Sequence, residues 1–164
     1  MADDDSAPAT PFAHLKTILV AIDGSDYSNY GLQVAADLSR ASKARVIAVH
    51  VRHLANEAVE IAASGGAVAG LDEIYNAADE VAEQARASAT KVLGNGDFEG
   101  WTYEERSGAT VDSIVEAVKE HTPDVVVVGA KGHNALYDLL VGSIAQGVVK
   151  HATASVLVAR KPEA

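Results

Sequence analysis

The 164-residue sequence contains no cysteine, which excludes disulfides, zinc–thiolate sites and cysteine nucleophiles. A chain without cysteine fits a reducing compartment, and we expect a cytoplasmic protein. The sequence is also poor in basic residues: 13 Lys and Arg stand against 23 Asp and Glu, a net charge of −10. A field of this sign repels nucleic acids and anionic membranes, so we expect neither as a partner. Any phosphate must therefore be bound by a local arrangement of donors.

Long apolar runs are missing too, since Val125 to Val128 and similar stretches are far shorter than the ~20 residues of a membrane span. The first residues carry Asp3, Asp4 and Asp5 but no basic segment followed by an apolar one, so we expect no signal peptide. We predict a disordered acidic tail over residues 1–14 and a single domain over residues 15–161.

From Lys16 onward, short apolar segments alternate with segments of helical periodicity. Predicted strands cover residues 16–22, 45–51, 101–105, 125–128 and 155–159. A first helix is predicted to begin at Ser25 or Asp26, and three more are predicted over residues 71–93, 110–122 and 142–152. Apolar stripes are expected at Gly31, Val34, Ala35 and Leu38, at Ile74, Ala77, Ala78 and Val81, and at Val111, Ile114, Val115 and Val118. The alternation predicts an α/β fold with a parallel sheet and helices on both faces.

Three loops at predicted strand ends carry unusual residues. The first reads Asp23-Gly24-Ser25, the second follows Val51, and the third reads Gly129-Ala130-Lys131-Gly132, then nine residues, then Gly142-Ser143. Because Gly142-Ser143 opens a predicted helix, unpaired N–H groups there form an anion site suited to a phosphate. The Ser143 hydroxyl either caps this helix or donates to a phosphate oxygen, and Lys131 either adds a charge or points into solvent.

The spacing Gly-x2-Gly-x9-Gly-Ser resembles the ATP-binding signature of universal stress proteins. The resemblance extends over Ile18 to Ser25, Val49-His50-Val51 and Ser155 to Val158. It implies a Rossmann-like, adenine nucleotide alpha hydrolase-like fold with five parallel strands in the order 3-2-1-4-5. It also implies a site for ATP, with Mg²⁺ as a further ligand that Asp23 would contact. The implied binding residues are Ala21, Asp23, Val51, Gly129, Lys131, Gly132, His133, Gly142, Ser143 and Ile144.

Within that site, the resemblance puts Asp23 beside the ribose, the main chain of Val51 at the adenine, and residues 142–144 at the phosphates. Ala145 departs from relatives that have a hydroxyl at this position, so one phosphate donor is missing. Members of the family commonly pair the last strand, here Ser155 to Ala159, with its copy in a homodimer. We predict the same dimer here, which would cover an apolar sheet edge.

Several readings of function remain open. The first is an ATP-binding stress-response regulator or switch; the alternatives are a weak ATPase or phosphotransferase, a sensor of AMP or cyclic AMP, and a structural dimer with an empty pocket. The sequence contains neither a P-loop nor a nucleophile elbow, so rapid phosphoryl transfer and triad hydrolysis lack support. His50 and His53 form no convincing zinc site. His151 is expected on the apolar stripe of the last helix, as a core or an interface residue.

Overall fold

The computed structural model describes residues 12–52, 70–94, 100–131 and 141–162. Its strands are β1 (Thr17–Ile22), β2 (Arg45–Arg52), β3 (Trp101–Ser107), β4 (Val125–Gly129) and β5 (Ser155–Ala159). All pairs are parallel, and the sheet order is β3-β2-β1-β4-β5, as the resemblance implies. β1 is the central strand, and its burial on both faces explains its unbroken apolar sequence.

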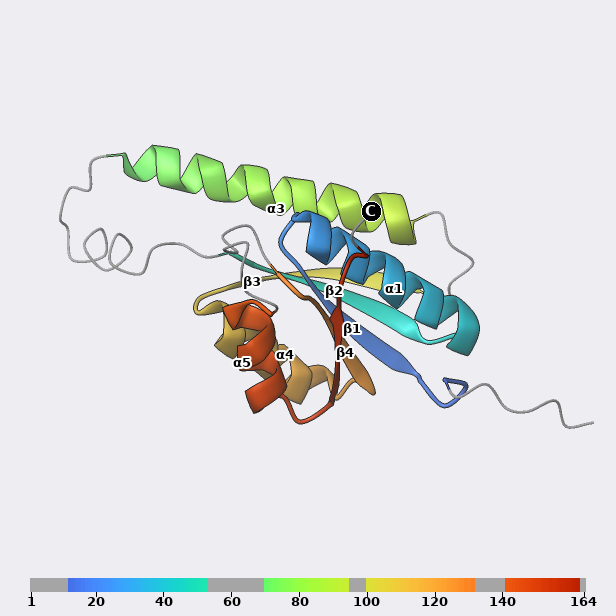
Figure 1. Ribbon diagram of the computed structural model, residues 1–164. Coiled ribbons are helices and arrows are strands. Elements are labelled where there is room, and N and C mark those ends of the chain that lie inside the picture. Colours follow the sequence, from blue (N-terminus) through green and yellow to red (C-terminus); the bar gives the residue numbers. More distant parts are fainter. Residues whose placement is uncertain (1–11, 53–69, 95–99, 132–140, 163–164) are drawn as a thin grey trace, which may run out of the picture.

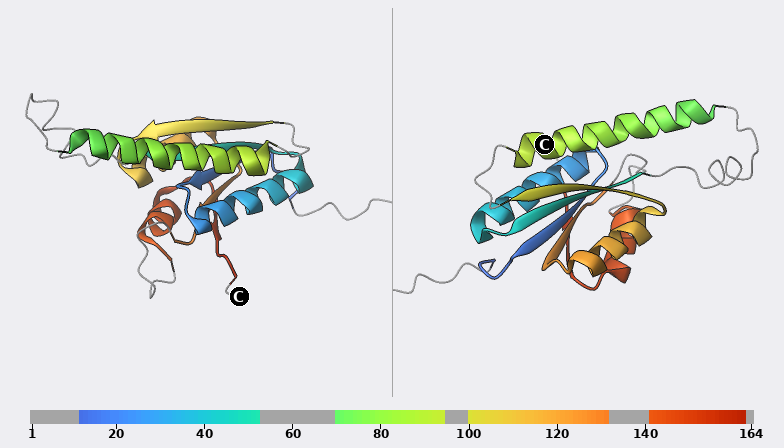
Figure 2. Two further views of the ribbon diagram at one scale, coloured as in Figure 1. Left: turned by 90° about the horizontal axis from the view of Figure 1, so that it is seen from above. Right: turned by 180° about the vertical axis from the view of Figure 1, so that it is seen from behind.

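The helices lie in two layers. α1 (Asp26–Ser42) and α3 (Leu71–Leu93) cover one face of the sheet, while α4 (Thr110–His121) and α5 (Ser143–His151) cover the other (Figure 1, Figure 2). The first core includes Ile18, Val20, Leu32 and Leu93, and the second includes Leu19, Ile114, Val126 and Val148. The alternation of β1 residues between the two cores is the period of 2 that a buried strand requires.

Helix limits follow local signals in the sequence. Ser25 is the N-cap of α1, because its hydroxyl oxygen accepts the Ser28 N–H. Thr122, with a φ of 43°, ends α4 in the left-handed region directly before Pro123. None of the helices in the described ranges has the length and apolarity that a membrane crossing demands.

The structure corrects two expected buried faces. On α3 the buried residues are Ala82, Ala85, Ala89 and Leu93, whereas Ala77 is exposed and Ile74, Ala78 and Val81 are only half-buried. The reason is the docking of the helix by its later turns, while its first turns extend past the end of β2 (Figure 1). His151 is exposed, so it is not a core residue of this chain, because α5 packs through Ala145 and Val148.

Candidate functional site at the carboxyl edge of the sheet

The strand order reverses between β1 and β4. From β1 the chain crosses to β2 on one side, while β4 lies on the other, so the two connections diverge at the carboxyl ends of β1 and β4. In open parallel sheets this divergence is where ligands bind. The loops that follow the two strands are those singled out in the sequence, beginning at Asp23 and at Gly129. The fold therefore brings both loops to one edge.

The Asp23 loop is held by hydrogen bonds within itself. Asp23 is half-buried, and its Oδ1 accepts the Ser25 N–H at 2.9 Å. Gly24 has a φ of 80°, a left-handed conformation that a residue with a side chain adopts only with strain. The Asn29 side-chain amide donates to the Gly24 carbonyl at 3.3 Å. The carboxylate therefore sits on a turn with a defined shape.

Gly129 has a packing role that the sequence does not reveal. A Cβ built on it would lie 2.8 Å from the carbonyl carbon of Tyr27 and 2.9 Å from the Ser28 nitrogen. Both are backbone atoms of the first turn of α1, which therefore rests directly on the end of β4. The Gly129 loop and the start of α1 are thus in rigid contact, and this contact links the two loops of the candidate site.

Beyond Gly129, the chain passes through Ala130 and Lys131. The Lys131 ammonium lies 5.9 Å from the centre of the Tyr27 ring, a cation–π distance. The Gly142 N–H donates to the Ala130 carbonyl at 2.7 Å, which brings the two ends of the loop together. The predicted site residues Gly132 and His133 lie outside the described residues.

The start of α5 corrects one alternative for Ser143. Gly142, not Ser143, is the N-cap, and Ser143 is the first helical residue, with an exposed side chain. Because glycine has no side chain that could cap the helix, the first-turn N–H groups of α5 receive no hydrogen bond from an N-cap side chain. Ile144 is 38% exposed, whereas Ala145 is buried in the second core.

The main chain of Val51 extends past the end of β1. The Arg45 N–H donates to Lys16 and the Val46 N–H donates to Gly100, so the odd residues of β2 direct their backbone groups toward β1. The register between β1 and β2 ends at Ile22 and His50. The Val51 carbonyl therefore faces the β1 side of β2, one residue after the last β1–β2 pair, where the chain leaves β1 as the Asp23 loop. Ala21, a further predicted residue, is half-buried on β1.

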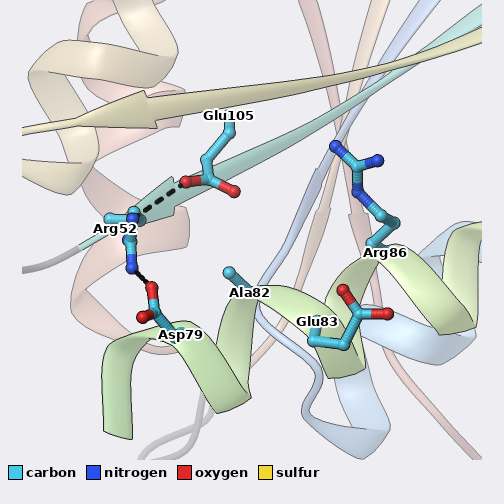
Figure 3. Close-up of a pocket in the computed structure, with 6 residues that line it drawn as sticks. All are labelled: Arg52, Asp79, Ala82, Glu83, Arg86 and Glu105. Atoms are coloured by element: carbon cyan, nitrogen blue, oxygen red, sulfur yellow. Dashed lines mark ion pairs between the residues drawn. The ribbon is translucent and has the colours of Figure 1, made fainter. Parts of the chain in front are cut away.

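A separate, charged groove of about 390 Å³ lies between α3 and the β2–β3 strands (Figure 3). It is lined by Arg52, Asp79, Ala82, Glu83, Arg86 and Glu105. Arg52 forms ion pairs with Asp79 and, at 3.4 Å, with Glu105. Arg86 lies over the ring of Tyr103, 4.6 Å from its centre. These contacts attach α3 to the sheet, so we interpret the groove as part of the packing interface between α3 and the sheet.

One group of three potential metal ligands occurs within the described ranges: Glu104, Glu120 and His121. Arg106 bridges both carboxylates at 2.5 Å. Burial lowers the pKa of Arg106, but its hydrogen bonds to Glu120 and Glu104 outweigh burial and raise it. The same hydrogen bond lowers the pKa of Glu120. The guanidinium thus already pairs with both carboxylates of this group. Of the histidine pair considered for zinc, His53 lies outside the described residues.

Two buried polar residues beside Asp23 were not predicted as part of the site. The Ser28 hydroxyl accepts the Asp23 N–H at 3.2 Å, and the His50 ring contacts the Ile22 carbonyl through Nδ1 at 2.9 Å. Ser28 is 4% exposed and His50 is 3% exposed. The sequence feature that could have pointed to Ser28 is its position three residues after the N-cap, where a residue bonds the cap. The signal for His50 was a polar residue inside an apolar strand.

Comparison with known proteins identifies the family to which the chain belongs. The model of the universal stress protein family matches residues 14–160. The universal stress protein YxiE of Bacillus subtilis is 29% identical over 149 residues, covering 87% of this chain and 97% of YxiE. The solved structure of UspA from Lactobacillus plantarum covers 89% of this chain and 98% of its own, with 24% identity and a TM-score of 0.74.

Two further solved structures share the fold and contain nucleotides. A universal stress protein in complex with cAMP is 24% identical, with a TM-score of 0.55, and covers 88% of this chain and 96% of its own. An Arabidopsis thaliana family member with AMP bound is 16% identical, with a TM-score of 0.55, and covers 90% and 92%. With the family model spanning nearly the whole described fold, the chain belongs to the universal stress protein family.

Proposed function

We propose that this chain binds an adenine nucleotide, with ATP as its ligand, and acts as a nucleotide-dependent regulator in the stress response. The observation that carries the proposal is the convergence of Asp23, the Val51 carbonyl and the start of α5 at the point where the strand order reverses. The cAMP-bound and AMP-bound relatives support adenine nucleotides as the ligand class.

Each part of a nucleotide meets a suitable group in this arrangement. The Val51 carbonyl would accept from the adenine amino group, and the Asp23 carboxylate would bind the ribose hydroxyls. First-turn N–H groups of α5 at Ser143 and Ile144 would donate to phosphate oxygens, aided by the dipole and the Ser143 hydroxyl. Mg²⁺, when bound, would neutralise phosphate charge, and Asp23 would contact it. Gly129, Lys131, Gly132, His133 and Ala21 complete the proposed surroundings.

The residue types present favour binding over turnover. Asp23, the carboxylate of the loop after β1, is already committed to the Ser25 N–H through Oδ1, and the carboxylate of the loop after β4, Asp138, lies outside the described residues. A second candidate function, a sensor of AMP or cyclic AMP, is favoured by the two nucleotide-bound relatives. Slow ATP hydrolysis is the third, and ADP release that stops on Asp23→Ala would support it.

The first experiment identifies the ligand. The protein is purified without added nucleotide and denatured, and the released ligand is identified by mass spectrometry; calorimetry then measures binding of ATP, AMP and cAMP. Gly142→Glu should abolish phosphate binding, because it places a carboxylate at the start of α5. Thr153→Glu adds the same charge at an exposed position beyond the far end of α5 and should bind as the unmodified protein does. A protein that is empty and binds none of the three nucleotides contradicts the proposal.

We also propose a cytoplasmic homodimer formed through the free edge of β5. The Ala130 N–H donates to the Ala159 carbonyl, so the odd residues of β5 direct their backbone groups toward β4. Val156 and Val158 therefore present theirs at the outer edge. Val158→Pro removes an outward N–H while keeping the β4 pairing, and should give a folded monomer in sedimentation experiments. Leu157→Pro should instead disrupt β4–β5 pairing and lower stability. A Val158→Pro protein that remains dimeric contradicts this interface.

A further inference from the structure

The peptide group between Ile22 and Asp23 is held at both of its polar atoms by buried side chains. Its N–H donates to the Ser28 Oγ at 3.2 Å, and its carbonyl oxygen lies 2.9 Å from the His50 Nδ1. Because a carbonyl only accepts, this contact requires the His50 tautomer with the proton on Nδ1. The two side chains come from α1 and β2, so this one peptide joins three elements at the candidate site.

Ser28 supplies a partner where the sheet no longer does. The Asp124 N–H donates to the Thr17 carbonyl, so odd residues of β1 direct their backbone groups toward β4. The register between β1 and β4 reaches Val20 and Val127, three residues before Asp23. Beyond it, the Asp23 N–H is bonded by a side chain instead of a strand. A buried N–H without a partner would cost about 1–3 kcal/mol, which explains a hydroxyl here.

The Ser28 hydroxyl is itself held in orientation. It donates to the Ser25 carbonyl at 3.1 Å, which leaves a lone pair directed at the Asp23 N–H. The Ser28 backbone N–H donates to the Ser25 hydroxyl at 3.2 Å, and the same nitrogen abuts Gly129. The residue therefore has little freedom to move away from the peptide that it holds.

We propose that Ser28 and His50 are positioning residues that clamp the Ile22–Asp23 peptide and thereby direct the Asp23 carboxylate toward the nucleotide. A peptide group is planar, so fixing its oxygen and its N–H fixes the plane. The plane fixes the position of the Asp23 N–Cα bond, so only rotation about that bond and within the side chain is left to move the carboxylate, and the Ser25 N–H holds Oδ1. This inference rests on the proposed function, because the benefit of the clamp is measured as ligand affinity.

The first test compares two buried serines of α1. Ser28→Ala removes the acceptor of the Asp23 N–H, and should weaken ATP binding about fivefold in calorimetry. Ser39→Ala is the matched control: Ser39 is 1% exposed and donates to the Ala44 carbonyl at 2.5 Å, at the far end of the same helix. It should lower the melting temperature comparably but leave the affinity unchanged. Equal affinity losses for the two variants would overturn the proposal.

A double-mutant cycle separates positioning from general damage. In an Asp23→Ala background, Ser28→Ala has no carboxylate left to misdirect, so its effect on ATP affinity should fall below about twofold. A loss that persists undiminished in that background would show that Ser28 acts independently of Asp23, and would overturn the proposal.

His50 gives a second test that needs no nucleotide. His50→Asn can place an amide N–H near the position of Nδ1, whereas His50→Leu has no donor. Hydrogen exchange of the Ser25 amide, which bonds Asp23 Oδ1, should quicken about fivefold in His50→Leu and recover in His50→Asn. Unchanged Ser25 exchange in His50→Leu would overturn the clamp. If the unmodified protein binds no nucleotide, the proposed function fails, while this exchange experiment still decides the clamp.

Discussion

Two glycines that face each other across the α1–β4 contact should respond oppositely to the same substitution. Gly129→Ala adds a Cβ within 2.8–2.9 Å of backbone atoms of Tyr27 and Ser28, a distance that real Cβ atoms do not show. Backbone cannot rotate away as a side chain can, so α1 or β4 must shift. Overpacking of this kind costs about 2 kcal/mol of unfolding free energy. For a chain of this size the melting temperature should fall by about 4–8 °C.

Gly31→Ala is the matched control, because its Cβ would meet Ala159 and Val127 at 3.6 Å, an ordinary van der Waals contact. Gly31 lies inside α1, where alanine is favoured over glycine by about 0.5–1 kcal/mol. This variant should therefore melt higher than the unmodified protein. Thermal unfolding followed by circular dichroism, with denaturant titration for the free energies, measures both. If Gly129→Ala is neutral, or if Gly31→Ala destabilises, the contact described here is wrong.

Three further predictions follow from single contacts. Asp124 accepts the backbone N–H groups of Lys16 and Thr17 at 2.7 and 2.9 Å, and these bonds lower its pKa. Its stabilisation is therefore present above its ordinary pKa near 3.8 and is lost as the pH falls through the lowered value. Asp124→Asn should cost less than about 1 kcal/mol at pH 7, since the site is exposed, and the difference should vanish in strong acid in urea titrations at several pH values. Arg106→Gln should raise the pKa of Glu120, measured by NMR, because the hydrogen bond that lowers it is gone; an unchanged pKa contradicts the bridge. Gly147→Ala should destabilise, because its Cβ would lie 2.7 Å from a Val111 methyl, and adding Val111→Ala should restore stability; no recovery would refute that contact.

Most elements of the fold could be predicted from the sequence because their signals are local. The apolar run ending at Ile22, the serine cap of α1 and the proline after α4 each mark an element limit within about one residue. The face of α3 could not be predicted. Its apolar residues continue past the end of the sheet, so periodicity alone does not tell which turns find a partner.

The site divides in the same way. Its position at the β1 and β4 ends followed from strand alternation together with the family order, and the structure has that order. The packing role of Gly129 and the bonds of Ser28 and His50 depend on residues from other elements, and no sequence pattern states which elements touch. Gly132 and His133 lie outside the described residues, so their roles stay predictions.

The central position of β1 has a consequence for synthesis of the protein on the ribosome. β1 pairs with β2 soon after both emerge, but its other neighbour, β4, begins at Val125, about 100 residues after Ile22. At typical translation speeds of about 5–20 residues per second, this apolar central strand has one open edge for about 5–20 seconds. The nascent chain therefore exposes an aggregation-prone strand for most of its synthesis, and chaperone binding early in translation should be concentrated on this segment.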